Sequence, residues 1–460
     1  MKKIWGKRVL LPDGWSDNTL IEIDAKGKIK EIKKNVRPSY NIFDTLIPSP
    51  MNLHSHCFQR AMSGLSERSE TKKNDFWSWR NFMYKFLNQI NPDYFESICA
   101  YAQMEMLEAG YAGVTEFHYI HNDLSGAPYN TLSEMSQRIV NASYQSGIGL
   151  TLLPVLYEQG GVFGENLISG QKRFGLNLEE FFKLVDELHS LHKKEKDTTI
   201  GVAAHSLRAV KKQSLLELSR KYTNCPIHIH VAEQNKEVTE ILNAWNRRPI
   251  EWLVDNLELN PKWCLIHCTQ MLNQEAKLLA KTGAVIGLCP ITEANLGDGI
   301  FNGEKWLKEG GKFGVGTDSN IKISLFEELR ILEYSQRLKN KKRIVLKPNN
   351  YLTIGRNLIE FILEGGELAS GRKTGKIKTG YWADILALDL SSFNYSSLNN
   401  DEKLNYLIFS ESEKNINSVF SAGRWVVKEG KHIQKEKIKS EYMETLQKIS
   451  KSGASLYFKK

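Results

Sequence analysis

Cysteine is scarce and long apolar runs are missing from this sequence of 460 residues. The six cysteines form no C-x-x-C pair, so neither a disulfide-stabilised scaffold nor a cysteine-rich zinc module is expected. Reduced thiols in the cytoplasm are the simple interpretation. No stretch holds the roughly 18 consecutive apolar residues of a membrane-spanning helix. Lys7, Arg8 and Pro12 interrupt the apolar run near the N-terminus, which therefore does not look like a signal peptide.

Other absences narrow the class of protein further. No G-x-G-x-x-G follows a first predicted strand, which disfavours a dinucleotide-binding domain. The composition, 41% hydrophobic and 25% charged, is that of a globular protein and excludes disorder or fibrous repeats. A formal net charge of +9 is unusual and by itself fits nucleic acid, a membrane surface or an anionic substrate. The basic cluster at residues 337–343 lacks interleaved aromatics for base stacking, so we expect a solvated loop and neither nucleic acid nor membrane as a partner.

Strand-like and helix-like segments alternate through the middle of the chain. Segments with helical periodicity include Pro92–Ala109, Leu178–Leu191 and Asn235–Leu257. The apolar or β-branched runs between such segments are Thr45–Leu53, Gly113–Phe117, Gly149–Leu156, Thr199–Ala204, Pro226–Val231, Trp263–His267, Ala284–Leu288 and Lys312–Gly316. This alternation predicts an α/β fold made of parallel βαβ units. Eight strands are the number in a closed (β/α)8 TIM-type barrel, with an open doubly wound sheet as the alternative.

The two ends of the chain have a different pattern, with short alternating segments separated by turns. We predict that residues 1–45 and 368–435 form one small composite domain, a β-sandwich built from the N- and C-terminal segments. Residues 46–367 would then form the barrel. The lysine-rich residues 436–460 are predicted to be a C-terminal helical tail.

Histidine pairs lie at the ends of two predicted strands. Residues i and i+2 of a strand point to the same side, so His54 and His56 are able to share one metal ion. His228 and His230 repeat this spacing, and Glu233 follows three residues after the second of them. A metal-activated water needs a nearby carboxylate to carry its proton, which is a role suited to this glutamate.

Three further strand ends carry polar groups of the same kind, namely His205, His267 and Asp318. Each has a structural alternative, because a lone histidine often packs in the barrel mouth and an aspartate after a strand often caps the next helix. Their common position at the carboxyl ends of successive strands favours a metal site. Catalytic zinc takes histidine nitrogen and carboxylate oxygen and keeps one position open. The joint pattern therefore predicts a metal-dependent hydrolase.

This set of strand-end residues resembles the amidohydrolase superfamily, and more narrowly its mononuclear deaminase branch. Cys57 departs from the usual pattern, in which a small residue is common, and we interpret it as a packing residue because it faces away from His54 and His56. Residues 375–384 resemble the closing motif at which the chain re-enters the small β domain. A closer similarity, to the formimidoylglutamate deiminases of histidine degradation, is carried by residues 51–62, 76–80, 116–119, 205–210 and 230–234.

The resemblance implies a role for each group of residues. One zinc ion per chain would be held by His54, His56, His230 and Asp318. The catalytic residues would be Glu233, His267 and Asp318. The substrate would be bound by Gln59, Arg80, Tyr119, His205 and Arg208, in which the planar guanidinium groups suit carboxylates.

The reaction implied is cleavage of a C–N bond in a linear amidine. N-formimidoyl-L-glutamate, a small anionic molecule derived from an amino acid, would react with water to give N-formyl-L-glutamate and ammonia. A homodimer is also implied. Ligand type only biases the choice between zinc and iron or another divalent ion.

Two other functions remain open on the sequence. The first is another deaminase of the same superfamily, acting on a purine, a pterin or a related amidine, which explains the metal site but not the two arginines. The second is a non-catalytic binding protein on a degenerate barrel, suggested only by the net charge of +9. The complete set of ligand-type residues disfavours the second.

Overall fold

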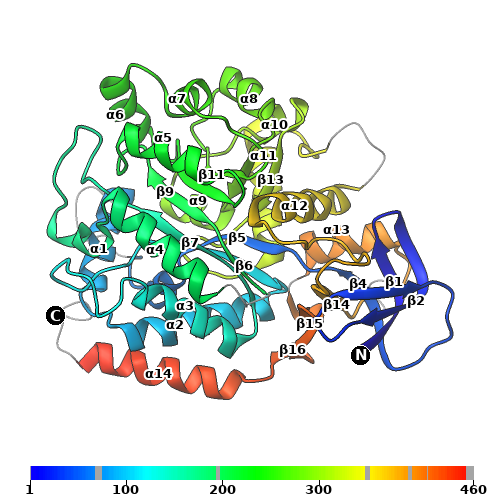
Figure 1. Ribbon diagram of the computed structural model, residues 1–460. Coiled ribbons are helices and arrows are strands. Elements are labelled where there is room, and N and C mark those ends of the chain that lie inside the picture. Colours follow the sequence, from blue (N-terminus) through cyan, green and yellow to red (C-terminus); the bar gives the residue numbers. More distant parts are fainter. Residues whose placement is uncertain are drawn as a thin grey trace.

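A parallel barrel forms the larger part of the molecule (Figure 1). The computed structural model describes residues 2–67, 75–192, 197–347, 353–391, 396–411 and 413–451. The barrel strands follow one another in chain order: β5 (Met51–Ser55), β6 (Gly113–His118), β7 (Gly149–Leu156), β9 (Val202–Ser206), β10 (Ile227–Val231), β11 (Trp263–His267), β12 (Val285–Leu288) and β13 (Lys312–Val315). A short strand, β8 (Thr198–Ile200), pairs with β7. The predicted barrel is therefore confirmed.

The first and last barrel strands meet just beyond their carboxyl ends. Ser55 and Asp318 form a parallel bridge, and the amides of Thr317 and Asp318 both donate to the His54 carbonyl at 3.0 and 2.9 Å. Gly316 makes this approach possible, because a Cβ there would lie only 2.5 Å from the His54 nitrogen. The glycine-rich end of β13 thus brings Asp318 against the histidine pair.

Both ends of the chain contribute to a separate sheet beside the barrel, as predicted (Figure 1). Its order is β17 (Lys431–His432), β16 (Arg424–Lys428), β15 (Ile416–Ser421), β14 (Ile385–Leu388), β4 (Asn41–Pro48), β1 (Lys2–Leu11), β2 (Gly14–Ile23) and β3 (Ile29–Lys33). The predicted β-sandwich thus takes the form of one hydrogen-bonded sheet. Its pairs are antiparallel except for β1 with β4. Apolar side chains of its strands form their own core, including Ile21, Leu46 and Phe420.

Helices cover the outside of the barrel and link it to the sheet. They are α1 (Phe76–Leu87), α2 (Pro92–Glu108), α3 (Glu134–Ser146), α4 (Leu178–Leu191), α5 (Lys212–Lys221), α6 (Asn235–Trp245), α7 (Pro249–Asn256), α8 (Asn273–Ala280), α9 (Pro290–Leu296), α10 (Gly303–Lys308), α11 (Leu325–Asn340), α12 (Ile354–Ser370), α13 (Asn400–Ser410) and α14 (Lys435–Lys451). The short 3-10 turns are η1 (Cys57–Met62), η2 (Ser169–Phe174) and η4 (Glu413–Asn415). Within the described residues, no helix is long and apolar enough to cross a membrane.

The helical periodicity over Asn235–Leu257 belongs to two helices rather than to one. α6 ends at Trp245, and the next residue, Asn246, has a φ of 51° in the left-handed region. Pro249 then starts α7 at its first position, where the missing N–H costs nothing. The prediction of one continuous helical segment was wrong because the spacing of apolar residues does not reveal a single residue with a left-handed backbone conformation.

The basic cluster at residues 337–343 is also not wholly a loop. α11 continues to Asn340, and Arg337 pairs with Glu333 one turn earlier at 2.8 Å. Lys341, with a φ of 53°, ends the helix.

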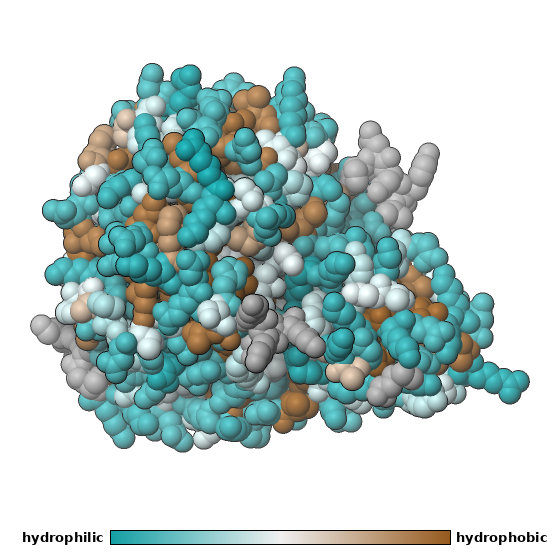
Figure 2. Space-filling view, viewed as in Figure 1, coloured by the Kyte–Doolittle hydropathy of each residue, from teal (hydrophilic) through white to brown (hydrophobic). Residues whose placement is uncertain are grey.

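The face of the molecule in Figure 2 carries mainly hydrophilic side chains over both the barrel and the small sheet.

The C-terminal helix α14 packs along the barrel (Figure 1). Its Tyr442 ring stacks on Tyr101 of α2 with the ring centroids 4.0 Å apart, and Ile438 and Ile449 are buried. The remainder of the predicted tail, residues 452–460, lies outside the described residues.

Candidate active site

Four side chains of types that bind metals meet at the carboxyl ends of the barrel strands. His54 lies on β5, His56 directly after it, His230 on β10 and Asp318 after β13. One ligand atom from each of them lies within 4.8 Å of those from the others, and all four side chains are buried. Asp318 Oδ1 is 3.4 Å from His54 Nε2 and 3.3 Å from His56 Nε2, and the Nε2 atoms of His54 and His230 are 3.0 Å apart.

The far side of two imidazoles is held by backbone carbonyls. His56 Nδ1 lies 2.9 Å from the Phe117 oxygen, and His230 Nδ1 lies 3.0 Å from the His205 oxygen. A carbonyl accepts only from a protonated Nδ1, so the Nε2 of each ring is left with its lone pair directed into the cluster. Burial lowers the pKa of His54 to about 3, and it lowers those of His56 and His230 as well. Three neutral nitrogens and one carboxylate are a donor set that suits a divalent cation such as zinc.

Asp318 is ionised and held in place rather than used as a helix cap. Burial alone would raise the pKa of its carboxyl, but His54, with Nε2 3.4 Å from Oδ1, and the nearby His56 and His267 hold it below its usual value. Asn320 donates to the Asp318 carbonyl at 3.1 Å, and Ser324 caps α11 instead.

Strained backbone gathers around this centre. Ala232, His267, Asp318 and Asn320 all have positive φ, with 73° at His267. Such conformations are uncommon for residues with a side chain and persist only where the surrounding structure imposes them. Each of these residues follows or ends a barrel strand, so the strain turns functional side chains toward one point.

Glu233 and His267 form the second part of the site. His267 Nε2 lies 3.7 Å from Glu233 Oε1 and 3.9 Å from Asp318 Oδ2. Burial raises the pKa of Glu233 to about 7, so its carboxyl is able to hold a proton near neutrality. Burial alone would lower the pKa of His267, but the carboxylates of Glu233, Glu293 and Asp318 raise it well above its usual value.

Two buried acidic residues that the sequence interpretation missed complete this corner. Glu293 of α9 lies 3.3 Å from His267 Nδ1 and accepts the Cys289 amide at 2.9 Å. Asp298 has one carboxylate oxygen within 4.8 Å of ligand atoms of Glu233 and His267. Both come after β12, the seventh barrel strand, but Glu293 lies within α9 and Asp298 beyond it, so a search of the strand ends alone does not find them.

His228 is excluded from the metal cluster although it shares a side of β10 with His230. Its Nε2 lies 2.8 Å from the carbonyl oxygen of Ala369, at the end of α12, and the ring is fully buried. It therefore has a packing role, which is the structural alternative for a lone histidine. Cys57 is also outside the cluster, with its thiol 2.9 Å from Glu116 Oε2.

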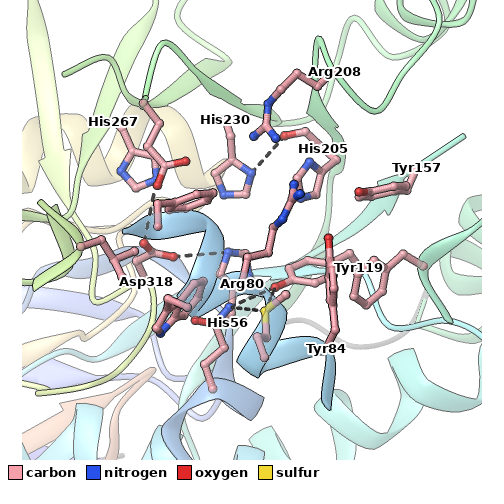
Figure 3. Close-up of a pocket in the computed structure, with 17 residues that line it drawn as sticks. His56, Arg80, Tyr84, Tyr119, Tyr157, His205, Arg208, His230, His267 and Asp318 are labelled. Carbon is pink, nitrogen blue, oxygen red and sulfur yellow. Dashed lines mark hydrogen bonds and ion pairs between the residues drawn. The ribbon is translucent and has the colours of Figure 1, made fainter. Parts of the chain in front are cut away.

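A pocket opens beside the metal-ligand cluster, and the predicted substrate-binding residues line it. Figure 3 shows His56, His230, His267 and Asp318 to one side of this pocket and Arg208, Tyr157 and Tyr84 to the other. The predicted residues brought together in its wall are Gln59, Arg80, Tyr119, His205 and Arg208, along with Glu233. Gln59 Nε2 donates to the Tyr119 hydroxyl at 3.0 Å.

Two arginine side chains in this wall lack an acidic partner. Arg208 is buried and Arg80 is half-buried. The Nε atoms of both are buried without a hydrogen-bond acceptor, and no ion pair to either is found among the described residues. Burial first, and then the charges of Arg208 and Arg80 among others, lower the pKa of His205 well below its usual value. A neutral histidine beside two unpaired guanidinium groups makes this end of the pocket attractive to an anion.

Comparison with known proteins places the chain in a family. The model of the amidohydrolase family matches residues 45–426, and that of the formimidoylglutamate deiminase HutF N-terminal domain matches residues 1–39. A formimidoylglutamate deiminase from Pseudomonas aeruginosa is 41% identical over 450 residues, which is 97% of this chain and 99% of the relative. The chain belongs to the amidohydrolase family, among the formimidoylglutamate deiminases. It is accordingly a hydrolase of C–N bonds in a metal-dependent family.

Solved structures agree with this placement. An amidohydrolase from Brucella melitensis superposes with a TM-score of 0.93 at 39% identity, covering 98% of this chain and 100% of that one. An adenosine deaminase from Xanthomonas campestris, solved with bound zinc, gives a TM-score of 0.80 at 18% identity over 98% of each chain. The second likeness concerns the fold alone. A more distant relative, 5-methylthioadenosine/S-adenosylhomocysteine deaminase of Pyrococcus furiosus, is 24% identical over 92% of this chain and 94% of its own length.

Proposed function

We propose that this protein hydrolyses N-formimidoyl-L-glutamate to N-formyl-L-glutamate and ammonia, a step of histidine degradation. The choice of substrate rests on Arg80 and Arg208, which lack an acidic partner among the described residues. Both line the pocket beside the metal-ligand cluster. A substrate with two carboxylates supplies the acceptors that these guanidinium groups lack. A neutral purine nucleoside does not, which disfavours the activity of the more distant relatives.

The metal we propose is one zinc ion per chain, held by His54, His56, His230 and Asp318. The convergence of their ligand atoms within 4.8 Å supports this set, and a solved deaminase of the same fold carries zinc. When bound, the cation supplies Lewis-acid chemistry and makes a water molecule more acidic.

We also expect the enzyme to be cytoplasmic, with reduced cysteines. We expect it to form a homodimer, and that expectation rests on resemblance alone.

Different residues of the site are placed to carry out the separate proton transfers of the reaction. The Asp318 carboxylate is placed to accept the proton of the attacking water. His267, whose Nε2 lies 3.9 Å from Asp318 Oδ2 and whose pKa is raised, is placed to orient that water by donating a hydrogen bond. Water adds to the formimino carbon, and the C–N bond to the terminal nitrogen breaks. Glu233, with its raised pKa, is placed to protonate that nitrogen, which leaves as ammonia. Glu293 holds His267 from behind, so that its Nε2 stays directed at the reaction centre.

The proposed activity is tested by the release of ammonia. Zinc-loaded protein is incubated with N-formimidoyl-L-glutamate and, separately, with 5′-methylthioadenosine and adenosine. We expect ammonia and N-formyl-L-glutamate from the first substrate and no deamination of the nucleosides. Turnover of a nucleoside without turnover of N-formimidoyl-L-glutamate would instead identify a purine deaminase.

Arg208→Ala is expected to weaken substrate binding without affecting the metal. Loss of hydrogen bonds to a charged partner should raise KM roughly 10- to 100-fold. Arg208→Lys should recover only part of this, because an ammonium lacks the planar fork. Arg220→Ala, an exposed arginine of α5, is the matched control and should match the wild type. Steady-state kinetics and metal analysis decide, and an unchanged KM would show that Arg208 does not bind a carboxylate.

A further inference from the structure

Three positively charged side chains surround one tryptophan just outside the pocket wall. Trp77 lies in the first turn of α1 and is half-buried. The guanidinium carbons of Arg80 and Arg208 lie 4.5 and 5.4 Å from its ring centroid, and Lys236 Nζ lies 4.3 Å from it. These side chains come from α1, the loop after β9 and the start of α6. We call this group, Trp77 with Arg80, Arg208 and Lys236, the Trp77 cluster.

Three positive charges this close repel one another, and among the described residues only the charge of Lys236 has an ion-pair partner. In the described part of the chain no carboxylate pairs with either arginine, and Lys236 pairs only with Glu240, at 3.7 Å. The negative face of an indole ring attracts cations and offsets part of this repulsion. The ring therefore holds the two guanidinium groups near the pocket without accepting their N–H donors. Those donors stay free for a carboxylate of the substrate, whereas an aspartate or glutamate in the place of Trp77 would compete with it.

We propose that Trp77 is the positioning residue for the two anion-binding arginines, and that Lys236 supplies a third charge that makes the pocket prefer dicarboxylates to monocarboxylates. This inference rests on the proposed function, because it presumes a substrate with two carboxylates. Trp77 and Lys236 do not line the pocket, so they act through the arginines and through the local electrostatic potential.

The role of Trp77 is tested by two substitutions in the zinc-loaded enzyme. Trp77→Leu removes the ring and is expected to raise KM for N-formimidoyl-L-glutamate about tenfold, with kcat changed far less. Trp77→Phe keeps an aromatic face and should stay within about threefold of the wild-type KM. The matched control is Trp245→Leu, because the Trp245 ring holds Lys212 at 4.8 Å but lies away from the pocket. The control should leave KM unchanged.

The role of Lys236 is tested by the choice between two substrates. Lys236→Met is compared with Lys212→Met as each enzyme hydrolyses N-formimidoyl-L-glutamate and the singly charged N-formimidoylglycine. The preference in kcat/KM for the doubly charged substrate should fall about threefold in Lys236→Met at low salt. The loss should fade at an ionic strength of about 1 M, where charges are screened within about 3 Å. Lys236 is more than half exposed, so this variant folds even if Trp77→Leu does not.

The outcomes separate the inference from the proposed function. A wild-type enzyme without activity on N-formimidoyl-L-glutamate overturns the proposed function. An active wild type whose KM is the same in Trp77→Leu overturns the positioning role. An unchanged substrate preference in Lys236→Met overturns the role of the third charge, whatever the folding of the Trp77 variants. Equal losses in Trp77→Leu and Trp245→Leu would show a general packing effect and count against the inference too.

Discussion

His230→Ala is expected to abolish metal binding and, with it, nearly all deiminase activity. His230 Nε2 faces the cluster, and its Nδ1 is held by the His205 carbonyl at 3.0 Å, so the ring is oriented before a metal binds. Removing an outer-shell partner already costs roughly 10- to 100-fold in metal affinity, and removing a ligand should cost more. Metal analysis after dialysis, together with ammonia release, gives the measurement. Added zinc should raise the melting temperature of the wild type but not of the variant, because a ligand stabilises only a state that binds it.

β10 itself provides the matched control for this prediction. His228 lies two residues earlier on the same strand, is also buried, and bonds the Ala369 carbonyl rather than the cluster. His228→Gln keeps a donor for that carbonyl and should retain zinc and activity, although some stability is lost. If His230→Ala kept its zinc, or if His228→Gln lost it, the assignment of His230 as the ligand would be wrong.

Glu233→Gln should lower kcat by about 10²- to 10⁴-fold, the range over which one general acid or base contributes. The amide has nearly the shape of the carboxyl but cannot transfer a proton. Glu233 is not one of the four proposed zinc ligands, so the zinc content should remain that of the wild type. Arg80 and Arg208, which line the same pocket, are unaltered by this substitution, so KM should change much less than kcat. This combination distinguishes a lost proton transfer from a damaged binding site.

Glu240→Gln serves as the control for this substitution, because it removes a partly exposed carboxyl from α6. Its kcat should match that of the wild type. A wild-type kcat in Glu233→Gln would assign the proton transfer to His267 or Asp318, whose side chains share the same corner. A joint loss of zinc and activity in this variant would show instead that Glu233 supports the metal site.

Much of the candidate site was predictable because it follows from local rules. The spacing of His54 and His56, and of His230 and Glu233, places side chains by the geometry of one strand and the turn after it. Parallel strands of a barrel present their carboxyl ends at one face, so residues far apart in the sequence had to meet. The extended motifs around Arg80 and Arg208 supplied the substrate-binding set, and the structure brings these residues into one pocket.

Other features depend on contacts between elements that no local pattern encodes. His228 and His230 are both histidines on the same side of β10. His228 stays out of the cluster because it bonds the Ala369 carbonyl at the end of α12. The break between α6 and α7 depends on one left-handed residue, Asn246. Glu293 reaches His267 from the following strand–helix unit, a distance in sequence of 26 residues.

The sequence by itself was enough to predict the barrel, the second sheet drawn from both ends and the candidate metal ligands at the strand ends. These depend on periodicity and residue type, which each segment carries alone. The tertiary structure decided which histidine enters the cluster and which carboxylate supports His267. It also showed that the positive charge at the pocket gathers around Trp77. Such choices depend on distances of a few ångströms between separate elements, and those distances exist only once the chain has packed.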